Sequence, residues 1–242
     1  MTFFDKKLIL DKNPWLTNLI LLDETPSTQT EAKKGPKNSL YLTSRQTAGY
    51  GRFGREYFAP AQGGIYMSAN LGPSKLDSPV QYTLLAAAAV VSAIEKLTSK
   101  KPQIKWVNDI YLGNKKFVGI LAESSATALA LGIGINFRIT EFPAELRARA
   151  SSLFSGEIPS ISESELVAGI WSEFHRLKTE NYLEIYKTHC FILGQNVAFT
   201  QNTINYEGLA VDLTELGELI VDCTDGVRRI LNSGEISLKK SE

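Results

Sequence analysis

The sequence has very few of the residues that build metal centres and disulfide frameworks. Its 242 residues include two cysteines, Cys190 and Cys223, and two histidines, His175 and His189. These four residues do not have the spacing of a zinc site, and a low cysteine content is typical of proteins in a reducing cytoplasm. The composition therefore favours a cytoplasmic location and provides no metal-binding pattern of cysteine and histidine.

The sequence also lacks an excess of charge of either sign and a long apolar run. Lysine plus arginine and aspartate plus glutamate both number 26, whereas a nucleic-acid-binding domain usually carries a basic excess. The first ten residues do not resemble a signal peptide, and no stretch of about 18 apolar residues indicates a membrane span. We therefore expect no nucleic-acid partner and no membrane insertion. With 43% hydrophobic residues, the chain can build the core of one medium-sized domain with a small appendage.

Predicted strands and predicted helices are mixed in the first part of the chain. Ser78-Pro79 is typical of an N-cap followed by the first helical residue, and Ser162 and Glu165 can form a capping box. Residues 64–71 alternate, which predicts a half-buried strand, and the later apolar runs indicate central strands. The predicted strands are 39–44, 64–71, 103–107, 117–124 and 128–136, and the predicted helices are 78–100, one that begins at 162, and 180–190.

The pattern changes near Gly194. Short alternating segments follow it, and Asp225-Gly226 predicts a two-residue hairpin turn. Residues 234–238 are predicted to form the last strand. The chain is therefore expected to have an α+β fold, with a mixed β-sheet flanked by helices over residues 1–193 and a small β-barrel over residues 194–242.

Residues 46–57 form a segment rich in glycine and arginine, which we call the Gly-Arg loop. Its three glycines leave backbone N–H groups open to an anion, and Arg52 and Arg55 can add bidentate contacts to phosphate oxygens. Ordering glycine costs more backbone entropy than ordering any other residue. We therefore expect the loop to be mobile when empty and ordered by an anionic ligand. A solvated hairpin with incidental arginines is the alternative.

A second stretch places charged groups close together on a predicted hairpin. Within residues 105–121, Asn108-Asp109 is a turn-forming pair between predicted strands. The Asp109 carboxylate can bind magnesium directly or through water, and Lys115 or Lys116 can reach a phosphate. The alternative is an ordinary surface turn, where residues of these types are common.

Two shorter stretches give weaker signals. Ser27 or Thr28 can cap a helix, with Thr28 and Glu31 as a capping box, and that structural role alone would explain them. Gly132 and Gly134 would let a ligand or a neighbouring strand approach the backbone closely.

In their order and spacing these stretches resemble the biotin protein ligases, from about residue 20 to the C-terminus. The resemblance implies a catalytic body like that of class II aminoacyl-tRNA synthetases and an SH3-like C-terminal barrel. No room precedes Ser27 for the DNA-binding domain of the family's repressors, so the short type is expected. The matching segments are Ser27-Thr28-Gln29, Gln46 to Arg55, Lys105 to Asp109, Lys116 to Leu121, Gly132 to Asn136, and the C-terminal "SGEISL".

The resemblance implies an enzyme that forms biotinyl-5′-AMP from biotin and ATP with Mg²⁺. The biotin then passes to a lysine of a biotin carboxyl carrier protein, that of acetyl-CoA carboxylase. Lys116, Arg52 and Asp109 are the expected catalytic residues, with Asp109 acting through Mg²⁺ or by holding Lys116. The expected biotin-binding residues are Ser27, Thr28, Gln29, Gln46, Gly49, Tyr50, Gly51, Arg52, Lys116, Gly119 and Gly132, and the expected ATP- and adenylate-binding residues are Arg52, Arg55, Tyr57, Asn108, Lys116 and Asn136.

The sequence departs from the family's pattern at five positions. Gln29 replaces an asparagine, Tyr50 and Phe53 replace arginines, Tyr57 replaces a tryptophan, and Val107 replaces a proline. The three expected catalytic residues are retained, so we expect activity, with Gln29 as the change that most alters ligand contacts. The alternatives are a lipoate or octanoate ligase of the same superfamily and a non-catalytic biotin-binding module. The sequence is compatible with a monomer or a homodimer.

Overall fold

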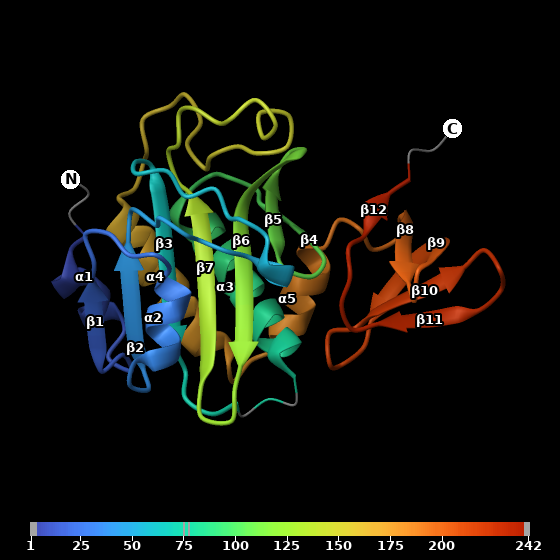
Figure 1. Ribbon diagram of the computed structural model, residues 1–242, viewed down its shortest axis with the longest axis horizontal. Helices are drawn as coiled ribbons and strands as arrows, with labels where there is room; N and C mark the ends of the chain where they lie inside the picture. Colours follow the sequence, from blue (N-terminus) through green and yellow to red (C-terminus); the bar gives the residue numbers. More distant parts are fainter. Residues whose placement is uncertain (1–3, 75, 77, 240–242) are drawn as a thin grey trace.

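The computed structural model describes residues 4–74, 76 and 78–239, which form two β-sheets with helices around the larger one (Figure 1). The larger sheet has the strand order β1-β2-β3-β7-β6-β5-β4. Its β1 and β2 pair in parallel and all its other pairs are antiparallel, which confirms the expected mixed sheet. The strands are β1 (Asn18–Leu21), β2 (Ser39–Thr43), β3 (Gly64–Asn70), β4 (Gln103–Lys105), β5 (Asp109–Leu112), β6 (Lys115–Ser124) and β7 (Leu129–Asn136).

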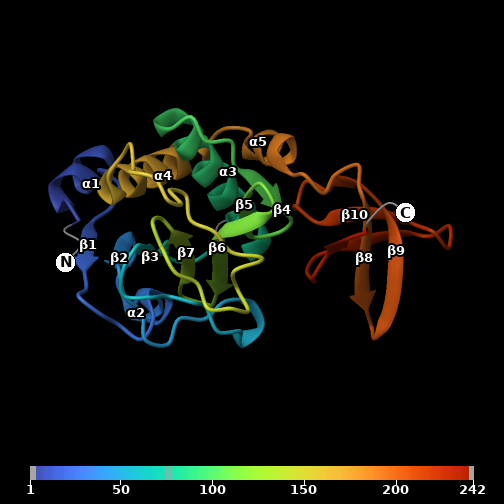
Figure 2. The same ribbon diagram turned by 90° about the horizontal axis from the view of Figure 1, so that it is seen from above.

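Helices cover both faces of this sheet. Figure 2 shows α1, α3, α4 and α5 along one side of the sheet and α2 on the other. Because α2 packs against β3, every residue of β3 is buried, and the prediction of a half-buried strand at 64–71 was wrong. The helices are α1 (Lys6–Lys12), α2 (Thr28–Lys34), α3 (Pro79–Leu97), α4 (Glu163–Leu177) and α5 (Tyr182–His189), and a 3₁₀ turn, η1, spans Arg52–Gly54.

Of the three later predicted strands, two lie in the interior of the sheet and one lies at its edge. Strands β6 and β7 lie in the interior of the sheet, as expected. The apolar run 103–107 was expected to be a central strand as well, but β4 lies at the edge of the sheet. It ends at Lys105 because the chain turns through residues 106–108 into β5, which pairs back with β4.

Helix α3 is the central helix of the body. It begins as predicted, with Pro79 as its first residue and a capping box between Ser78 and Gln81. It ends at Leu97, earlier than the predicted position 100, where the Thr98 backbone N–H and hydroxyl both donate to Ile94 O. Among the described residues α3 alone is long and apolar enough to cross a membrane, and 67% of that window is buried inside the protein. Helix α3 therefore belongs to the core of the larger body.

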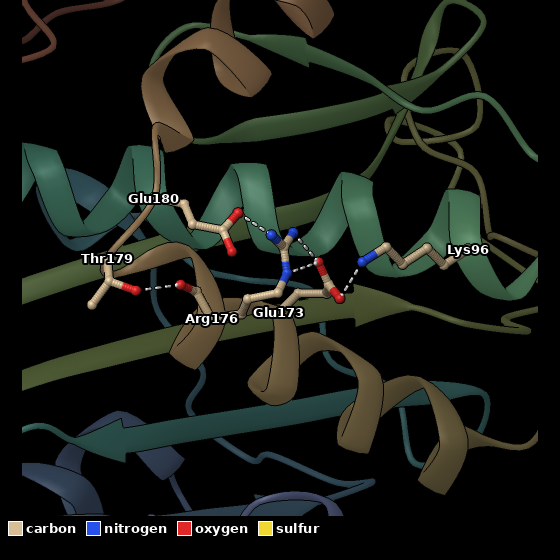
Figure 3. A network of polar contacts seen from close by, with 5 residues as sticks. All are labelled: Lys96, Glu173, Arg176, Thr179 and Glu180. Atoms are coloured by element: carbon tan, nitrogen blue, oxygen red, sulfur yellow. Dashed lines mark hydrogen bonds and ion pairs between the residues drawn. The ribbon is translucent and has the colours of Figure 1, made fainter.

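Helix α4 packs along α3, and an ionic network joins the two (Figure 3). The Glu173 carboxylate, on a residue that is only 8% exposed, accepts from Lys96 of α3 at 2.6 Å and from Arg176 at 2.7 Å. Arg176 also pairs with Glu180, and Thr179 Oγ1 donates to Arg176 O at 3.2 Å. Burial alone would raise the pKa of Glu173, but the bonds from Arg176 and Lys96 outweigh it and hold that pKa below its usual value.

The C-terminal residues form the smaller, five-stranded sheet, which is antiparallel throughout and has the order β11-β10-β9-β8-β12. This confirms the expected small β domain, whereas a domain boundary between 193 and 194 stays a prediction. The predicted hairpin at Asp225-Gly226 is present, but its loop spans residues 224–227, and the last strand is shorter than predicted. The strands are β8 (Asn196–Gln201), β9 (Ile204–Leu213), β10 (Leu219–Cys223), β11 (Arg228–Leu231) and β12 (Ser237–Leu238).

The smaller sheet is docked on the larger body at the turn between β9 and β10. Trp106 Nε1 donates to Gly217 O at 2.9 Å. Gly217 has φ +83°, and a methyl group at this position would lie 2.5 Å from a methyl carbon of Leu84 on α3. A glycine is therefore required here both for the backbone conformation and for the close approach.

Candidate active site

A cavity of about 910 Å³ opens between α2, the Gly-Arg loop, the β6–β7 face of the sheet and residues 234–237, which lead into β12 of the smaller sheet. Gly49 lies behind Gln46 and is the one predicted site residue that does not line the cavity. The predicted residues that line it are Ser27, Thr28, Gln29, Gln46, Tyr50, Gly51, Arg52, Arg55, Tyr57, Asn108, Asp109, Lys116, Gly119, Gly132 and Asn136. Segments that are far apart in the sequence thus meet around one space.

Backbone hydrogen bonds hold the Gly-Arg loop over the cavity. Its first residues follow the segment before α2, where Thr47 N donates to Thr25 O at 3.0 Å and Ala48 N to Pro26 O at 2.9 Å. Its two arms then pair with each other through Gly51 N to Arg55 O at 2.8 Å and Tyr57 N to Gly49 O at 2.9 Å. The tip between these arms is the 3₁₀ turn η1.

Phe53 lies at the tip of the loop in an unusual conformation. Its φ is +59°, in the left-handed region that residues other than glycine rarely adopt, and the residue is 69% exposed. The Arg52 guanidinium lies 5.0 Å from the centre of the Phe53 ring. The tip therefore stores backbone strain, and strained residues of this kind cluster at active sites and ligand clamps.

Hydrogen-bonding side chains gather at the α2 end of the cavity. Gln46 Oε1 accepts from the Thr28 backbone N–H at 2.8 Å and from the Thr28 hydroxyl at 3.1 Å, and Thr28 Oγ1 lies 2.9 Å from Ser68 Oγ. Ser27 is the N-cap residue of α2, but its hydroxyl makes no capping bond. The expected capping box of Thr28 and Glu31 was wrong, because the Thr28 side chain is used by Gln46 and Ser68.

The Gln29 side chain extends from α2 to the sheet. Its Nε2 donates to Glu123 Oε2 at 3.0 Å and to Ala130 O at 3.1 Å. Its Oε1 is buried and has no hydrogen-bond partner among the described residues. A methyl group at position 132 would lie 2.6 Å from this oxygen and 3.1 Å from Ser68 Oγ. The glycine at 132 therefore leaves space beside two acceptor atoms.

Charged side chains gather at the other end of the cavity. Lys116 Nζ lies 2.6 Å from Asp109 Oδ1 in an ion pair between adjacent strands β5 and β6. Arg52 Nη1 donates to Asn108 Oδ1 at 3.1 Å, which fixes the loop to the β4–β5 turn. Burial lowers the pKa of Arg52, although the nearby Asp109 carboxylate opposes this, and the guanidinium remains charged at neutral pH. Together these groups offer a partly desolvated positive site for an anion.

Glycines form the floor of the cavity, and an aromatic ring covers part of it. Tyr57 OH donates to Gly134 O at 2.9 Å. A methyl group at Gly119 or Gly134 would lie 3.0 Å or 2.7 Å from the Tyr57 ring. Burial raises the pKa of Tyr57, so the ring carries a neutral phenol at physiological pH. The ring edge meets Tyr66 with centroids 6.2 Å apart.

The sequence analysis missed several residues that line this cavity. Ser68 is a buried polar residue on β3, and its position between Met67 and Ala69 in an apolar strand was the signal that could have found it. Residues 234–237 belong to the segment that leads into β12 of the smaller sheet, and Arg55 pairs there with Glu235. No local pattern connects these residues with the Gly-Arg loop.

The carboxylates of the site do not make a metal-binding cluster by themselves. Over the part of the chain that the structure describes, no group of three or more His, Cys, Asp or Glu side chains is arranged to hold a metal ion. Asp109 is a single carboxylate beside Lys116. This arrangement suits a magnesium ion that arrives on a nucleotide triphosphate, because such an ion needs only one or two carboxylates from the protein.

Comparison with known proteins identifies the class to which this fold and site belong, the enzymes that join biotin or lipoate to a protein. The sequence pattern of the Biotin/lipoate A/B protein ligase family matches residues 20–139, and that of the Biotin protein ligase C terminal domain matches residues 192–239. The bifunctional ligase/repressor BirA of Bacillus subtilis is 31% identical over 241 residues, which cover 89% of this chain and 73% of the relative. The chain therefore belongs to the biotin protein ligases.

Further relatives agree with this assignment. The biotin–[acetyl-CoA-carboxylase] ligase of Mycobacterium tuberculosis is 27% identical, over 81% of this chain and 77% of the relative. The biotin protein ligase of Aquifex aeolicus, solved in complex with biotin and ATP, superimposes with a TM-score of 0.80 at 31% identity. That alignment covers 93% of this chain and all of the Aquifex chain.

Proposed function

We propose that this protein is a biotin–[acetyl-CoA-carboxylase] ligase. It activates biotin with ATP and then transfers it to a lysine of the biotin carboxyl carrier protein. The observation that carries this proposal is the single cavity that joins the hydrogen-bonding end at Thr28 and Gln46 to the cationic end at Lys116 and Arg52. The similarity to the biotin–[acetyl-CoA-carboxylase] ligase of Mycobacterium tuberculosis supports the acceptor.

In the first half-reaction the biotin carboxylate attacks the α-phosphorus of ATP. A carboxyl oxygen–phosphorus bond forms, the bond between the α- and β-phosphates breaks, and pyrophosphate leaves. Negative charge on the carboxylate and on the α-phosphate oxygens must be neutralised as they approach. Lys116 supplies a positive charge at this point, and Asp109, 2.6 Å from Lys116 Nζ, keeps the ammonium group in place. Asp109 is the carboxylate that would contact a magnesium ion carried by ATP, and such an ion would supply positive charge to the triphosphate.

In the second half-reaction the neutral amine of the carrier lysine attacks the acyl carbon of biotinyl-5′-AMP. An amide bond forms, the carbon–oxygen bond to AMP breaks, and the amine loses its proton to solvent. The mixed anhydride must be protected from water until the carrier arrives. The Gly-Arg loop covers the cavity and Arg52 holds it to Asn108, so this loop is the part of the protein that excludes water.

The two ends of the cavity suit the two ends of biotin. The ureido ring has one carbonyl acceptor and two N–H donors, so it needs both kinds of partner. Ser27, Thr28, Gln29 and Gln46 provide hydroxyl and amide groups at the α2 end, and Gly119 and Gly132 leave room for the ligand on the sheet. Arg55, Tyr57, Asn108 and Asn136 line the part of the cavity assigned to the nucleotide.

The proposal extends to the cellular location and the oligomeric state of the enzyme. Both cysteines are free and buried, which fits a cytoplasmic enzyme, and burial raises the pKa of the Cys190 thiol to about 11. The enzyme acts as a monomer or a homodimer.

Exchange of labelled pyrophosphate into ATP tests the proposed function. The exchange requires reversible adenylation, so it should depend on biotin. Lipoate is the control because lipoate ligases share part of the family pattern. Lipoate-dependent exchange would replace the proposal by a lipoate ligase, and no exchange with either acid would leave a binding module. Transfer of biotin to a purified biotin carboxyl carrier protein, and not to a variant without the target lysine, would complete the test.

A further inference from the structure

A carboxylate outside the predicted site lies at the junction of α2, the Gly-Arg loop and β6. Glu123, near the end of β6, is half-buried and has three polar neighbours. Its Oε1 pairs with Lys33 Nζ at 2.8 Å, and its Oε2 accepts from Tyr50 OH at 3.1 Å and from Gln29 Nε2 at 3.0 Å. Lys33 Nζ also donates to Tyr50 OH at 3.1 Å, so the contacts form a closed network.

This network fixes which end of the Gln29 amide faces the cavity. The neighbours of Nε2 are all acceptors: Glu123 Oε2, Ala130 O and, at 3.4 Å, Leu121 O. A flipped amide would place Oε1 against these three oxygens, which would be repulsive. Glu123 is the only charged member of the three, and a hydrogen bond to a charged acceptor is the strongest of its kind. Glu123 therefore contributes most to holding the amide in the observed orientation.

The orientation leaves an acceptor without a donor. Gln29 Oε1 is buried and has no partner in the described part of the chain, while Gly132 and Ser68, which line the same cavity, are its neighbours. A buried acceptor that stays unpaired is costly, so a bound ligand that brings an N–H to this place is favoured. A ligand whose ring has no N–H would bury the oxygen further and leave it unpaired.

We propose that Glu123 is a positioning residue that fixes Gln29 as a hydrogen-bond acceptor, and that the pair makes the cavity select a ring with an N–H over an apolar ring. The inference rests on the proposed function, because biotin has such a ring and lipoate does not. Tyr50 of the Gly-Arg loop shares Glu123 Oε2 with Gln29, so the closed loop and the selecting amide depend on the same carboxylate. Gln29 and Tyr50 are two of the positions at which the sequence departs from the family pattern.

Pyrophosphate exchange with biotin and with lipoate, and direct titration of biotin by calorimetry, test this inference. Glu123→Ala should raise the Kd and KM for biotin about tenfold, leave kcat for biotin nearly unchanged, and reduce the preference for biotin over lipoate by a similar factor. Glu123→Gln should restore most of the preference, because its amide oxygen can still accept from Gln29. Glu24→Ala is the matched control, since Glu24 pairs with Arg45 just before the loop and neither residue lines the cavity.

A double-mutant cycle shows whether Glu123 acts through Gln29. Gln29→Leu should lose the same preference for biotin, and adding Glu123→Ala to it should change the preference little further. Additive effects of the two substitutions on the preference would overturn the inference. It would also be overturned if Glu123→Ala lost exchange equally for both acids and had a lower melting temperature, because that result would assign Glu123 a structural role. If the parent protein exchanges with biotin but Glu123→Ala keeps its affinity and preference, only this inference fails. If the parent does not exchange with biotin, the proposed function fails and this inference with it.

Discussion

At the scale of single residues, the ion pair with Asp109 fixes the position of the Lys116 ammonium group in the cavity. The ammonium group of a free lysine is mobile, but Asp109 on the adjacent strand holds Lys116 Nζ 2.6 Å away and next to Gly119 on the cavity floor. A charge that is already in position costs no reorganisation when negative charge develops in the transition state. The pair can therefore serve adenylation without a large movement of the protein.

Lys116→Ala should lose adenylation while the fold survives. The expected loss in the rate of biotin-dependent pyrophosphate exchange is about 10²- to 10³-fold, the usual effect of removing one group that stabilises transition-state charge. Lys115→Ala is the control, because Lys115 is adjacent on β6 but points to Arg147 O outside the cavity. Equal exchange rates for Lys116→Ala and the parent would remove Lys116 from the mechanism.

Arg52→Gly should separate adenylation from retention of the adenylate. The variant loses the guanidinium that we propose contacts phosphate and the bond to Asn108, and it adds a fourth glycine to the loop, so the closed state costs more. Under the proposed mechanism adenylation depends on Lys116 and should continue, but biotinyl-5′-AMP should escape and label lysines of bystander proteins. Incubation with biotin, ATP and an unrelated protein measures this. A variant that makes adenylate yet labels the bystander no more than the parent would show that another residue retains the intermediate.

At the scale of elements, the packing of α4 on α3 supports the sheet from the face opposite the cavity. The Glu173 carboxylate is nearly buried and is satisfied by Lys96 of α3 and by Arg176 of α4 (Figure 3). Removing one partner of such a group leaves the others unpaired, which costs more than the bond itself contributes.

Glu173→Gln should lower the free energy of unfolding by about 1 to 2 kcal/mol at pH 7. The pKa of Glu173 lies below its usual value of 4.5 in the folded protein, so its contribution is present above that value and is lost as the pH falls through the folded pKa. The difference between variant and parent in urea unfolding should therefore shrink in acid. Glu180→Gln, which removes an exposed partner of the same Arg176, should cost less than about 0.5 kcal/mol. A difference that does not change with pH would contradict this account.

The Gly-Arg loop should be the element that changes most on binding. It is held by a few backbone bonds, by Arg52 to Asn108 and by Tyr50 to Glu123, and its tip has a strained residue at Phe53. Hydrogen exchange of residues 46–57 should slow when biotin and ATP are both present, while exchange of α3 stays unchanged. Full protection of the loop in the empty protein would rule out ordering by ligand.

The parts of this molecule that the sequence could predict are those set by local chemistry. The Gly-Arg loop and the start of α3 each follow from residues close together in the chain, and the structure has them where expected. The predicted turn at Asn108-Asp109 is only partly correct, because the turn covers residues 106–108 and Asp109 begins strand β5. The partners of Glu123 and the ring of Tyr57 on the glycines could not be predicted. They depend on which strands are neighbours in the sheet and on which face α2 covers. For the same reason β3 was expected to be half-buried.

At the scale of the whole molecule, the smaller sheet completes the wall of the cavity. Residues 234–237 line it, and the sheet is held in place where Gly217 meets Trp106 and Leu84. A substitution at this contact should therefore affect ligand binding in the cavity, even though the contact lies outside the cavity.

Gly217→Ala should impair both stability and ligand binding. A methyl group would lie 2.5 Å from a carbon of Leu84, and φ +83° is unfavourable for alanine, so a loss of about 2 to 4 kcal/mol is expected with raised KM values for biotin and ATP. Gly226→Ala is the matched control, because its φ of +81° is similar and its methyl group would contact nothing within 4 Å. It should cost about 1 kcal/mol and leave both KM values unchanged. Equal effects of the two variants would show that only backbone strain matters.

The contribution of residues 234–237 to the cavity has a consequence for synthesis on the ribosome. Of all the segments that line the cavity, this one is translated last, long after Lys116 and the Gly-Arg loop. A nascent chain that has emerged only as far as α5 (Figure 1) has the glycine floor and the lysine but no wall from the smaller sheet. The complete reaction chamber therefore forms only when nearly all of the described chain has been made, so an incomplete chain cannot enclose a reactive anhydride.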